Sequence, residues 1–264
     1  MDLDLKPIPE AYLTEAEHGG RLEELEIPDF SPAAVYLPYG YDASGERYST
    51  FYVLHGGGGN PYSFFSEDGR FKNMLDHMIA NGDIDPLIIV APTYYPPGRS
   101  GDGIAYSGEA VREFGPVLLK RVVPLVDGTY RTIADRRNRG IGGFSMGAVA
   151  TWYVFMAGLD LFHWFMPLSG DCWICGELGG GKHAKQTASL IGHTVQGREF
   201  YLHALTGTKD IAFPNLDPQM QAMKDLPYVF QFGKNTFYSV LEDGVHDYPD
   251  IRRYIFNALP AFFK

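Results

Sequence analysis

The sequence predicts an α/β fold, a mostly parallel sheet with helices on both faces, in a single domain over residues 1–264. Short runs rich in β-branched and aromatic residues alternate with segments whose apolar residues recur every three or four positions. No internal repeat, low-complexity tract or linker-like run divides the 264 residues, a length ordinary for one α/β domain.

Each predicted element follows from one of these two patterns. The β-rich runs predict strands over residues 33–37, 48–54, 87–91, 139–144, 165–168, 199–205 and 236–241. The three-and-four spacing predicts helices over residues 71–80, 108–126, 145–159, 218–226 and 247–258.

Three connections carry further expectations. The first two strands, joined by a turn over residues 38–42, are expected to form an antiparallel pair at the N-terminal edge of the sheet. Pro116 is expected to kink or restart the second helix. Residues 176–197 are Gly-rich and polar without a clear period, so we expect a long surface loop beside a site.

Composition narrows the class of partner. The formal net charge of -10 disfavours nucleic acid and anionic membrane surfaces, whereas a neutral or polymeric substrate is compatible with it. Aromatic residues make up 14% of the chain, and rings in a cleft commonly hold sugars or aryl groups. The sequence shows neither an apolar run of about 18 residues nor a signal-peptide pattern at its start.

The two cysteines form a C-x-x-C pattern at Cys172 and Cys175. Such a pattern fits a redox pair, half of a metal site or a local disulfide. A structural zinc site is disfavoured because a second pair is absent, and we expect two loop thiols or a short structural disulfide.

Ser145 stands in the pattern Gly-x-Ser-x-Gly at residues 143–147, between a predicted strand and a predicted helix. A serine on such a tight turn is pushed out of the sheet, and its flanking glycines avoid collisions with neighbouring backbone. The start of the following helix directs backbone donors toward the same point. This context predicts a nucleophilic serine.

A serine hydroxyl needs a histidine base and a carboxylate that orients the histidine. His246 lies in a short loop after the last predicted strand, where Gly244 supplies backbone freedom. Asp210 follows the strand at 199–205 and is the chosen acid, since catalytic groups gather at the carboxyl edge of such sheets. Asp171 is the main rival, and Asp243 and Asp247 are close to His246 in sequence.

The run His-Gly-Gly-Gly-Gly at residues 55–59 follows a predicted strand, where hydrolases of this type keep a backbone donor for the oxyanion. The Met146 amide is expected to be the second donor. A phosphate-binding loop is disfavoured because no Gly-Lys-Ser/Thr follows, and the dinucleotide fingerprint is not met.

Taken together, these motifs resemble carbohydrate esterase family 1, the feruloyl and acetylxylan esterases related to the esterase D and mycolyltransferase group. The resemblance spans about residues 35–263. It is carried by Val-Tyr-Leu-Pro at 35–38, Leu-His-Gly-Gly-Gly-Gly at 54–59, Gly-Phe-Ser-Met-Gly at 143–147, Ser-Gly-Asp-Cys-Trp at 169–173, Gly-Thr-Lys-Asp at 207–210 and Gly-Val-His-Asp-Tyr at 244–248.

The resemblance implies an α/β-hydrolase fold without a large lid and a Ser145, Asp210 and His246 triad. It also implies oxyanion donors at Gly57 and Met146. Trp173 is implied as a contact for the aryl group, with a core or rim tryptophan as the alternative. The chain departs from the family at Tyr248, where tryptophan is usual, and in its C-x-x-C around Trp173.

The function so implied is hydrolysis of feruloyl (hydroxycinnamoyl) esters of plant cell-wall arabinoxylan, without a metal or organic cofactor. Expected substrates are feruloylated arabinoxylan oligosaccharides or small hydroxycinnamate esters. The alternatives are an acetylxylan esterase, a broad short-chain carboxylesterase, or a non-catalytic carbohydrate-binding module with a hydrolase shell. A secreted protein, and membership of a larger multidomain enzyme, are also expected, with a cytoplasmic location as the alternative.

Overall fold

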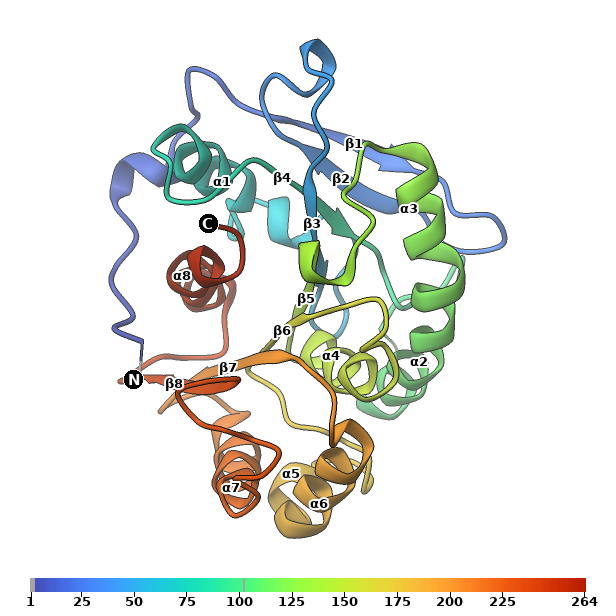
Figure 1. The fold of residues 1–264 in the computed structure, drawn as a ribbon, viewed down its shortest axis with the longest axis vertical. Helices are drawn as coiled ribbons and strands as arrows, with labels where there is room; N and C mark the ends of the chain where they lie inside the picture. The colour runs from blue at the N-terminus through green and yellow to red at the C-terminus, as the bar shows by residue number, and fades with distance from the viewer. Residues whose placement is uncertain (1–2, 102) are drawn as a thin grey trace.

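The computed structural model describes residues 3–101 and 103–264, which contain one eight-stranded sheet in the order β1-β2-β4-β3-β5-β6-β7-β8. Strands β3 to β8 run parallel to one another. At one edge, β2 pairs antiparallel with both β1 and β4 (Figure 1). The strands are β1 Arg21–Leu25, β2 Ala33–Leu37, β3 Ser49–Leu54, β4 Leu87–Ala91, β5 Arg139–Phe144, β6 Trp164–Leu168, β7 Tyr201–Gly207 and β8 Thr236–Leu241. The predicted α/β class and its antiparallel edge are confirmed.

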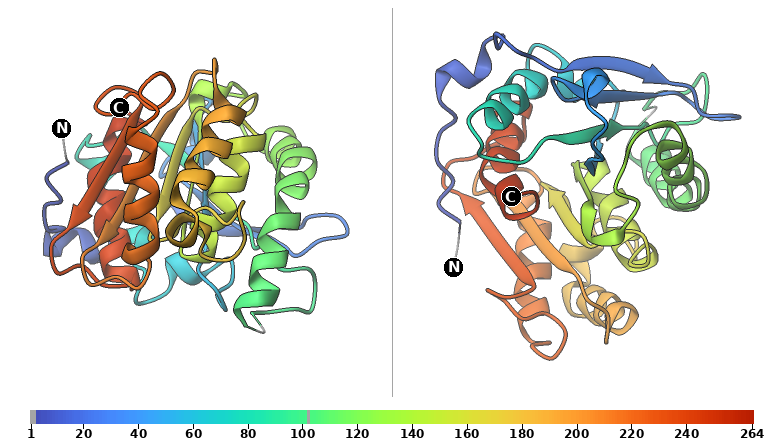
Figure 2. Two further views of the ribbon diagram at one scale, coloured as in Figure 1. Left: turned by 90° about the horizontal axis from the view of Figure 1, so that it is seen from below. Right: turned by 45° about the horizontal axis from the view of Figure 1, so that its top comes forward.

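Helices cover both faces of the sheet, with α1 and α8 on one face and α2, α3, α4, α6 and α7 on the other (Figures 1 and 2). Their bounds are α1 Phe71–Ala80, α2 Ile104–Val117, the π-helical turn η4 Leu118–Val122, α3 Val123–Thr129, α4 Met146–Ala157, α5 Gly179–Lys182, α6 Ala184–Val195, α7 Phe213–Lys224 and α8 Tyr248–Ala258. Short 3-10 turns occur at η1 Glu10–Leu13, η2 Tyr41–Ala43, η3 Ser63–Phe65, η5 Arg136–Asn138 and η6 Leu259–Ala261.

The central strands are apolar on both faces because both faces are covered. In β2, Val35 and Leu37 pack into the cluster beneath α2 and α4, while Ala34 and Tyr36 pack into the cluster beneath α1 and α8. All five residues of β2 are buried, which explains its unbroken apolar run.

The expected antiparallel pair of the first two predicted strands is wrong. Strand β2 pairs with β1 and β4, whereas β3 pairs in parallel with β4 and β5, so β4 lies between β2 and β3. The chain does reverse direction after the predicted turn at residues 38–42, but a turn pattern does not determine which strand lies beside β2. Strand β1 escaped prediction because its sequence, Arg-Leu-Glu-Glu-Leu, is that of a charged edge strand.

The expected long loop over residues 176–197 is also wrong, since it holds α5 and the twelve-residue α6. The buried positions of α6 are helically spaced but include Thr187, Ala188 and Gly192, whose small side chains give little apolar contrast. Pro116, by contrast, lies within α2 without ending it, and the irregular π-helical turn follows at Leu118–Val122. Helix α3 continues directly from this turn, so the chain stays helical from Ile104 to Thr129 and the expected restart at Pro116 is not seen.

No helix in the described part of the chain has both the length and the apolar character needed to cross a bilayer. The single domain over residues 1–264 stays a prediction.

His203, on β7, provides a test of the core. Burial lowers the pKa of its imidazole from 6.5 to about 3, so the unfolded chain binds the proton more tightly than the folded chain. The free energy of unfolding is therefore predicted to fall as pH drops from about 6.5 toward 3. Replacement by glutamine, which can still hydrogen-bond Ser239 but does not titrate, should remove about 2 to 3 kcal/mol of the loss between pH 7 and 4.5.

Urea denaturation of both proteins at the two pH values measures this difference. An equal loss in the wild type and in His203→Gln would contradict a buried, neutral His203.

Candidate active site

The predicted site residues meet at the carboxyl edge of the sheet. Ser145 directly follows β5, Asp210 follows β7, and His246 follows β8. The Gly-rich loop after β3 and the segment from Ser169 after β6 reach the same edge. Parallel strands bring these loops together although they lie far apart in the sequence.

Ser145 occupies a strained turn between β5 and α4. Its φ of 56° and ψ of −114° are unfavourable for a residue with a side chain. A Cβ on Gly143 would lie 2.3 Å from the Gly147 carbonyl oxygen, and one on Gly147 would lie 2.2 Å from the Leu54 carbonyl oxygen. Both glycines are therefore required for close backbone approach, and the turn directs the Ser145 hydroxyl out of the sheet.

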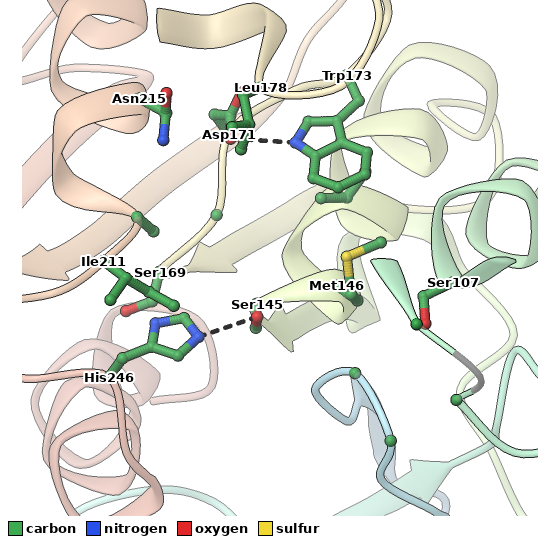
Figure 3. A pocket seen from close by; sticks show the side chains of 17 residues that line it. Ser107, Ser145, Met146, Ser169, Asp171, Trp173, Leu178, Ile211, Asn215 and His246 are labelled. Atoms are coloured by element: carbon green, nitrogen blue, oxygen red, sulfur yellow. Dashed lines mark hydrogen bonds between the residues drawn. The ribbon is translucent and has the colours of Figure 1, made fainter. Parts of the chain in front are cut away.

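A chain of hydrogen bonds joins the three predicted triad residues. His246 Nδ1 lies 2.7 Å from Asp210 Oδ1, and His246 Nε2 lies 3.0 Å from Ser145 Oγ. An ionised carboxylate only accepts, so Nδ1 carries the proton and Nε2 accepts from the serine hydroxyl (Figure 3). The imidazole also rests against the Phe144 ring, with centroids 4.6 Å apart.

Asp210 stays ionised despite its burial. Burial alone would raise the pKa of its carboxyl, but hydrogen bonds from His246 and the Ala212 amide, with the nearby Ser169 hydroxyl, outweigh it. The net effect lowers the pKa from its ordinary value of 3.8. The Asp210 carboxylate is therefore charged at neutral pH, and it can hold His246 in the tautomer that carries its proton on Nδ1.

The three rival acids have other partners. Asp171 accepts from Trp173 Nε1 and from the Gly180 amide, and Asp243 forms a surface ion pair with Lys209. Asp247 caps α8 by accepting from the Asp250 amide. Only Asp210 among these four aspartates is hydrogen-bonded to the His246 ring.

Gly244 serves the His246 loop for a reason other than the expected one. Its backbone does not lie in the left-handed region, which Asp243 occupies instead with a φ of 61°. A Cβ on Gly207 would lie 2.3 Å from the Gly244 carbonyl carbon, so the two segments touch. A Cβ on Gly244 would in turn lie 2.8 Å from the Tyr254 hydroxyl oxygen, so close packing accounts for both glycines.

The Gly-rich loop lies directly against the serine turn. A Cβ on Gly57 would be 3.2 Å from Met146 Cγ, and one on Gly56 would be 3.7 Å from Ser145 Cβ. Neither the Gly57 nor the Met146 amide has a hydrogen-bond acceptor among the described residues. Two free donors beside a serine hydroxyl can receive the negative charge of a tetrahedral intermediate.

His55 fixes the orientation of this loop, a role that the sequence did not reveal. Burial lowers the pKa of its imidazole to about 4, so the ring is neutral at pH 7. Its Nδ1 donates to the Gly56 carbonyl at 2.7 Å, and its Nε2 accepts from Thr93 at 2.8 Å. The Tyr94 hydroxyl also donates to the Gly56 carbonyl, at 2.9 Å. These bonds hold the peptide plane that presents the Gly57 amide.

A cavity of about 410 Å³ opens beside Ser145, and we call it the Trp173 cavity (Figure 3). Trp173 forms part of its wall, with the indole fixed by a 3.1 Å hydrogen bond to Asp171. Most of the remaining wall is apolar and comes from Met146, Val149, Leu178, Ile211 and Ala212, with polar atoms from Ser107 and Asn215. Leu178 comes from the segment expected to border the site, whereas Ser107, Ile211 and Asn215 carried no sequence signal.

The two cysteines are free thiols, the first of the two expected alternatives, and the short disulfide is not formed. Cys172 is buried, and burial raises the pKa of its thiol well above the ordinary range, which makes the reactive thiolate scarce. Among residues 3–101 and 103–264, no three His, Cys, Asp or Glu side chains gather as a metal site.

Fold and site together define an α/β-hydrolase with the geometry of a serine hydrolase. The family model described as "Putative esterase" matches residues 28–198, more than half of the chain. The chain therefore belongs to this esterase family, and it is a carboxylic ester hydrolase. The resemblance drawn from its motifs is confirmed.

Several known proteins are similar to the chain. The endo-1,4-beta-xylanase Y of Acetivibrio thermocellus is 37% identical over 98% of this chain and 24% of its own length. An endo-1,4-beta-xylanase/feruloyl esterase of Xylanibacter ruminicola is 33% identical over 58% of this chain and 21% of its own. The chain thus spans about a quarter of the length of these curated relatives.

Two solved structures share the fold. A mutant of the feruloyl esterase module from Clostridium thermocellum, complexed with sinapinate, is 36% identical with a TM-score of 0.81, over 100% of this chain and 94% of that chain. The CE1 ferulic acid esterase from the anaerobic fungus Anaeromyces mucronatus is 20% identical with a TM-score of 0.76, over 99% and 98%. At that lower identity the likeness concerns the fold alone.

Replacing Ser145 with alanine is predicted to lower ester turnover by at least about 10⁴-fold, because the attacking oxygen is removed.

Asp210→Asn should lower kcat by about 10⁴-fold while leaving substrate binding largely intact, since it misorients the imidazole. Steady-state kinetics on one ester substrate measure both effects. Asp243→Asn is the matched control, and unchanged activity in Ser145→Ala would refute Ser145 as the nucleophile.

Proposed function

We propose that the chain hydrolyses feruloyl and related hydroxycinnamoyl esters through an acyl-enzyme on Ser145. The observation that carries this is the Trp173 cavity, an apolar space with an indole wall that opens directly on Ser145 Oγ. The similarity to the feruloyl esterase module of Clostridium thermocellum supports the same substrate class.

In the first half of the reaction, Ser145 Oγ attacks the ester carbonyl while His246 Nε2 takes its proton. Asp210 stabilises the resulting imidazolium, and the Gly57 and Met146 amides stabilise the oxyanion. His246 then gives the proton to the departing alcohol. A water molecule, activated by the same His246, attacks the acyl-enzyme and releases the acid.

The size of the cavity favours an aryl acid over acetate. A volume of about 410 Å³ falls in the range of pockets that enclose small organic ligands, and it is far larger than an acetyl methyl group fills. The rigid indole offers a flat surface for a second ring, an arrangement that adds about 0.5 to 1.5 kcal/mol beyond simple burial.

The expected substrates are small hydroxycinnamate esters and feruloylated arabinoxylan oligosaccharides. The curated relatives are longer than this chain, which supports the proposal that it works as one module of a multidomain enzyme. A location outside the cell, where such polymers occur, stays a prediction.

A comparison of acyl groups tests the proposal. With methyl ferulate and acetylated xylan as substrates, ferulate release is predicted to exceed acetate release by at least about tenfold in kcat/KM, because only the aryl acid fills the Trp173 cavity. Product formation by liquid chromatography gives both rates. Release of acetate alone would refute the feruloyl assignment.

Trp173 should set this preference. Trp173→Ala is predicted to lower the feruloyl-to-acetyl ratio of kcat/KM by about tenfold, since the wall against which the aryl ring packs is lost. Trp173→Phe keeps an aromatic ring and should retain most of the ratio. An unaltered ratio in the alanine variant, with the fold intact by circular dichroism, would make Trp173 a packing residue only.

A further inference from the structure

A second hollow meets Ser145 and His246, and it shares Gly57 and Gly58 with the Trp173 cavity but has different walls elsewhere. It measures about 630 Å³ and is lined by residues 56–59, Ser63, Asp68, Phe144 and residues 247–249. A shallower hollow of about 310 Å³ shares Ser63, Asp68 and Tyr248 with it and adds Leu22, Asn60, Tyr62, Phe65 and Ser66. We call the two together the Tyr248 groove.

The position of the Tyr248 groove indicates which half of the substrate it binds. In the tetrahedral intermediate, the former carbonyl carbon is bonded to Ser145 Oγ, to the rest of the acid and to the oxygen of the alcohol. The acid and the alcohol therefore point in different directions. If the aryl acid fills the Trp173 cavity, the alcohol leaves through the other hollow that touches His246, its proton donor. This step rests on the proposed function.

We propose that the Tyr248 groove binds the saccharide that carries the ester, with Tyr62 and Asp68 as its main contacts. The Tyr62 ring is 41% exposed and forms part of the groove wall, so its face can stack on the C–H surface of a sugar ring. The exposed Asp68 carboxylate has no hydrogen-bond or ion-pair partner among the described residues. A carboxylate can accept from two hydroxyl groups of one sugar.

The charge of the groove selects a neutral occupant. No lysine or arginine lines either part, while Asp68 and Asp247 are both present. Arg252 does not line the groove but interacts electrostatically with both carboxylates, and an anionic alcohol or a phosphate would have to compete with them for it. A neutral polyhydroxylated chain fits both this charge and the mixture of aromatic and polar walls.

The groove is also held in shape before any ligand arrives. The Tyr62 hydroxyl donates to Glu24 at 2.9 Å, and the Asn60 amide donates to Ser63 at 2.9 Å. Arg252 donates to the backbone carbonyl of Asp68, also at 2.9 Å. These bonds fix the loop that carries both proposed contacts, which lowers the entropy lost on binding.

Two esters with the same acyl group test this inference, namely methyl ferulate and a feruloylated arabinoxylan trisaccharide. The ratio of their kcat/KM values isolates the contribution of the saccharide. Tyr62→Ala and Asp68→Ala are each predicted to lower the trisaccharide-to-methyl ratio by at least about fivefold, mainly through KM. Tyr228→Ala, another exposed tyrosine that lines neither hollow, is the matched control and should keep the wild-type ratio.

A further variant separates stacking from loop anchoring. Tyr62→Phe loses the bond to Glu24 but keeps the ring, and it should retain most of the wild-type ratio. Unchanged ratios in both alanine variants would overturn the inference, and a fall in Tyr62→Phe equal to that in Tyr62→Ala would overturn the stacking role. A wild-type protein that hydrolyses neither ester would refute the proposed function itself.

Discussion

The contact of the Ser145 turn with the end of β3 is the constraint on which the site depends. Gly147 lies so close to the Leu54 carbonyl that only hydrogen fits, and Gly143 lies equally close to Gly147. The positive φ of Ser145 between these glycines costs about 1 to 3 kcal/mol, and the packed sheet around it holds the turn in place. The same contact brings the serine beside the Gly-rich loop, because that loop begins where β3 ends.

The rest of the chemistry follows from this arrangement. Once Ser145 is pushed out of the sheet, His246 reaches it from the loop after β8, and Asp210, after β7, holds His246 with a charge maintained by its hydrogen bonds. His55 and Tyr94 support the Gly57 amide from behind. The site therefore combines a reaction centre with two different walls, an apolar one at Trp173 and a mixed aromatic and polar one at Tyr248.

The sequence predicted the reaction centre better than its surroundings. The structure brings Ser145, Asp210 and His246 together as predicted, because each stands shortly after a recognisable strand, while their catalytic roles stay a prediction. The neighbours of β2 and β3 were not predicted, since local patterns do not encode which strands pair across a long connection. Helix α6 was missed because its buried face includes the small residues Thr187, Ala188 and Gly192, which give little apolar contrast. Ser107, Ile211 and Asn215 line the Trp173 cavity through tertiary packing alone, and no local sequence pattern marks them.

The central claim is that Ser145 carries the acyl group during turnover. It is tested most directly by acid-quenching the reaction with methyl ferulate and analysing the proteolysed protein by mass spectrometry. The account predicts a feruloyl group on the peptide that contains Ser145, formed in a burst before steady-state release of ferulate. A feruloyl group on another residue, or turnover with neither a burst nor a modified peptide, would contradict it.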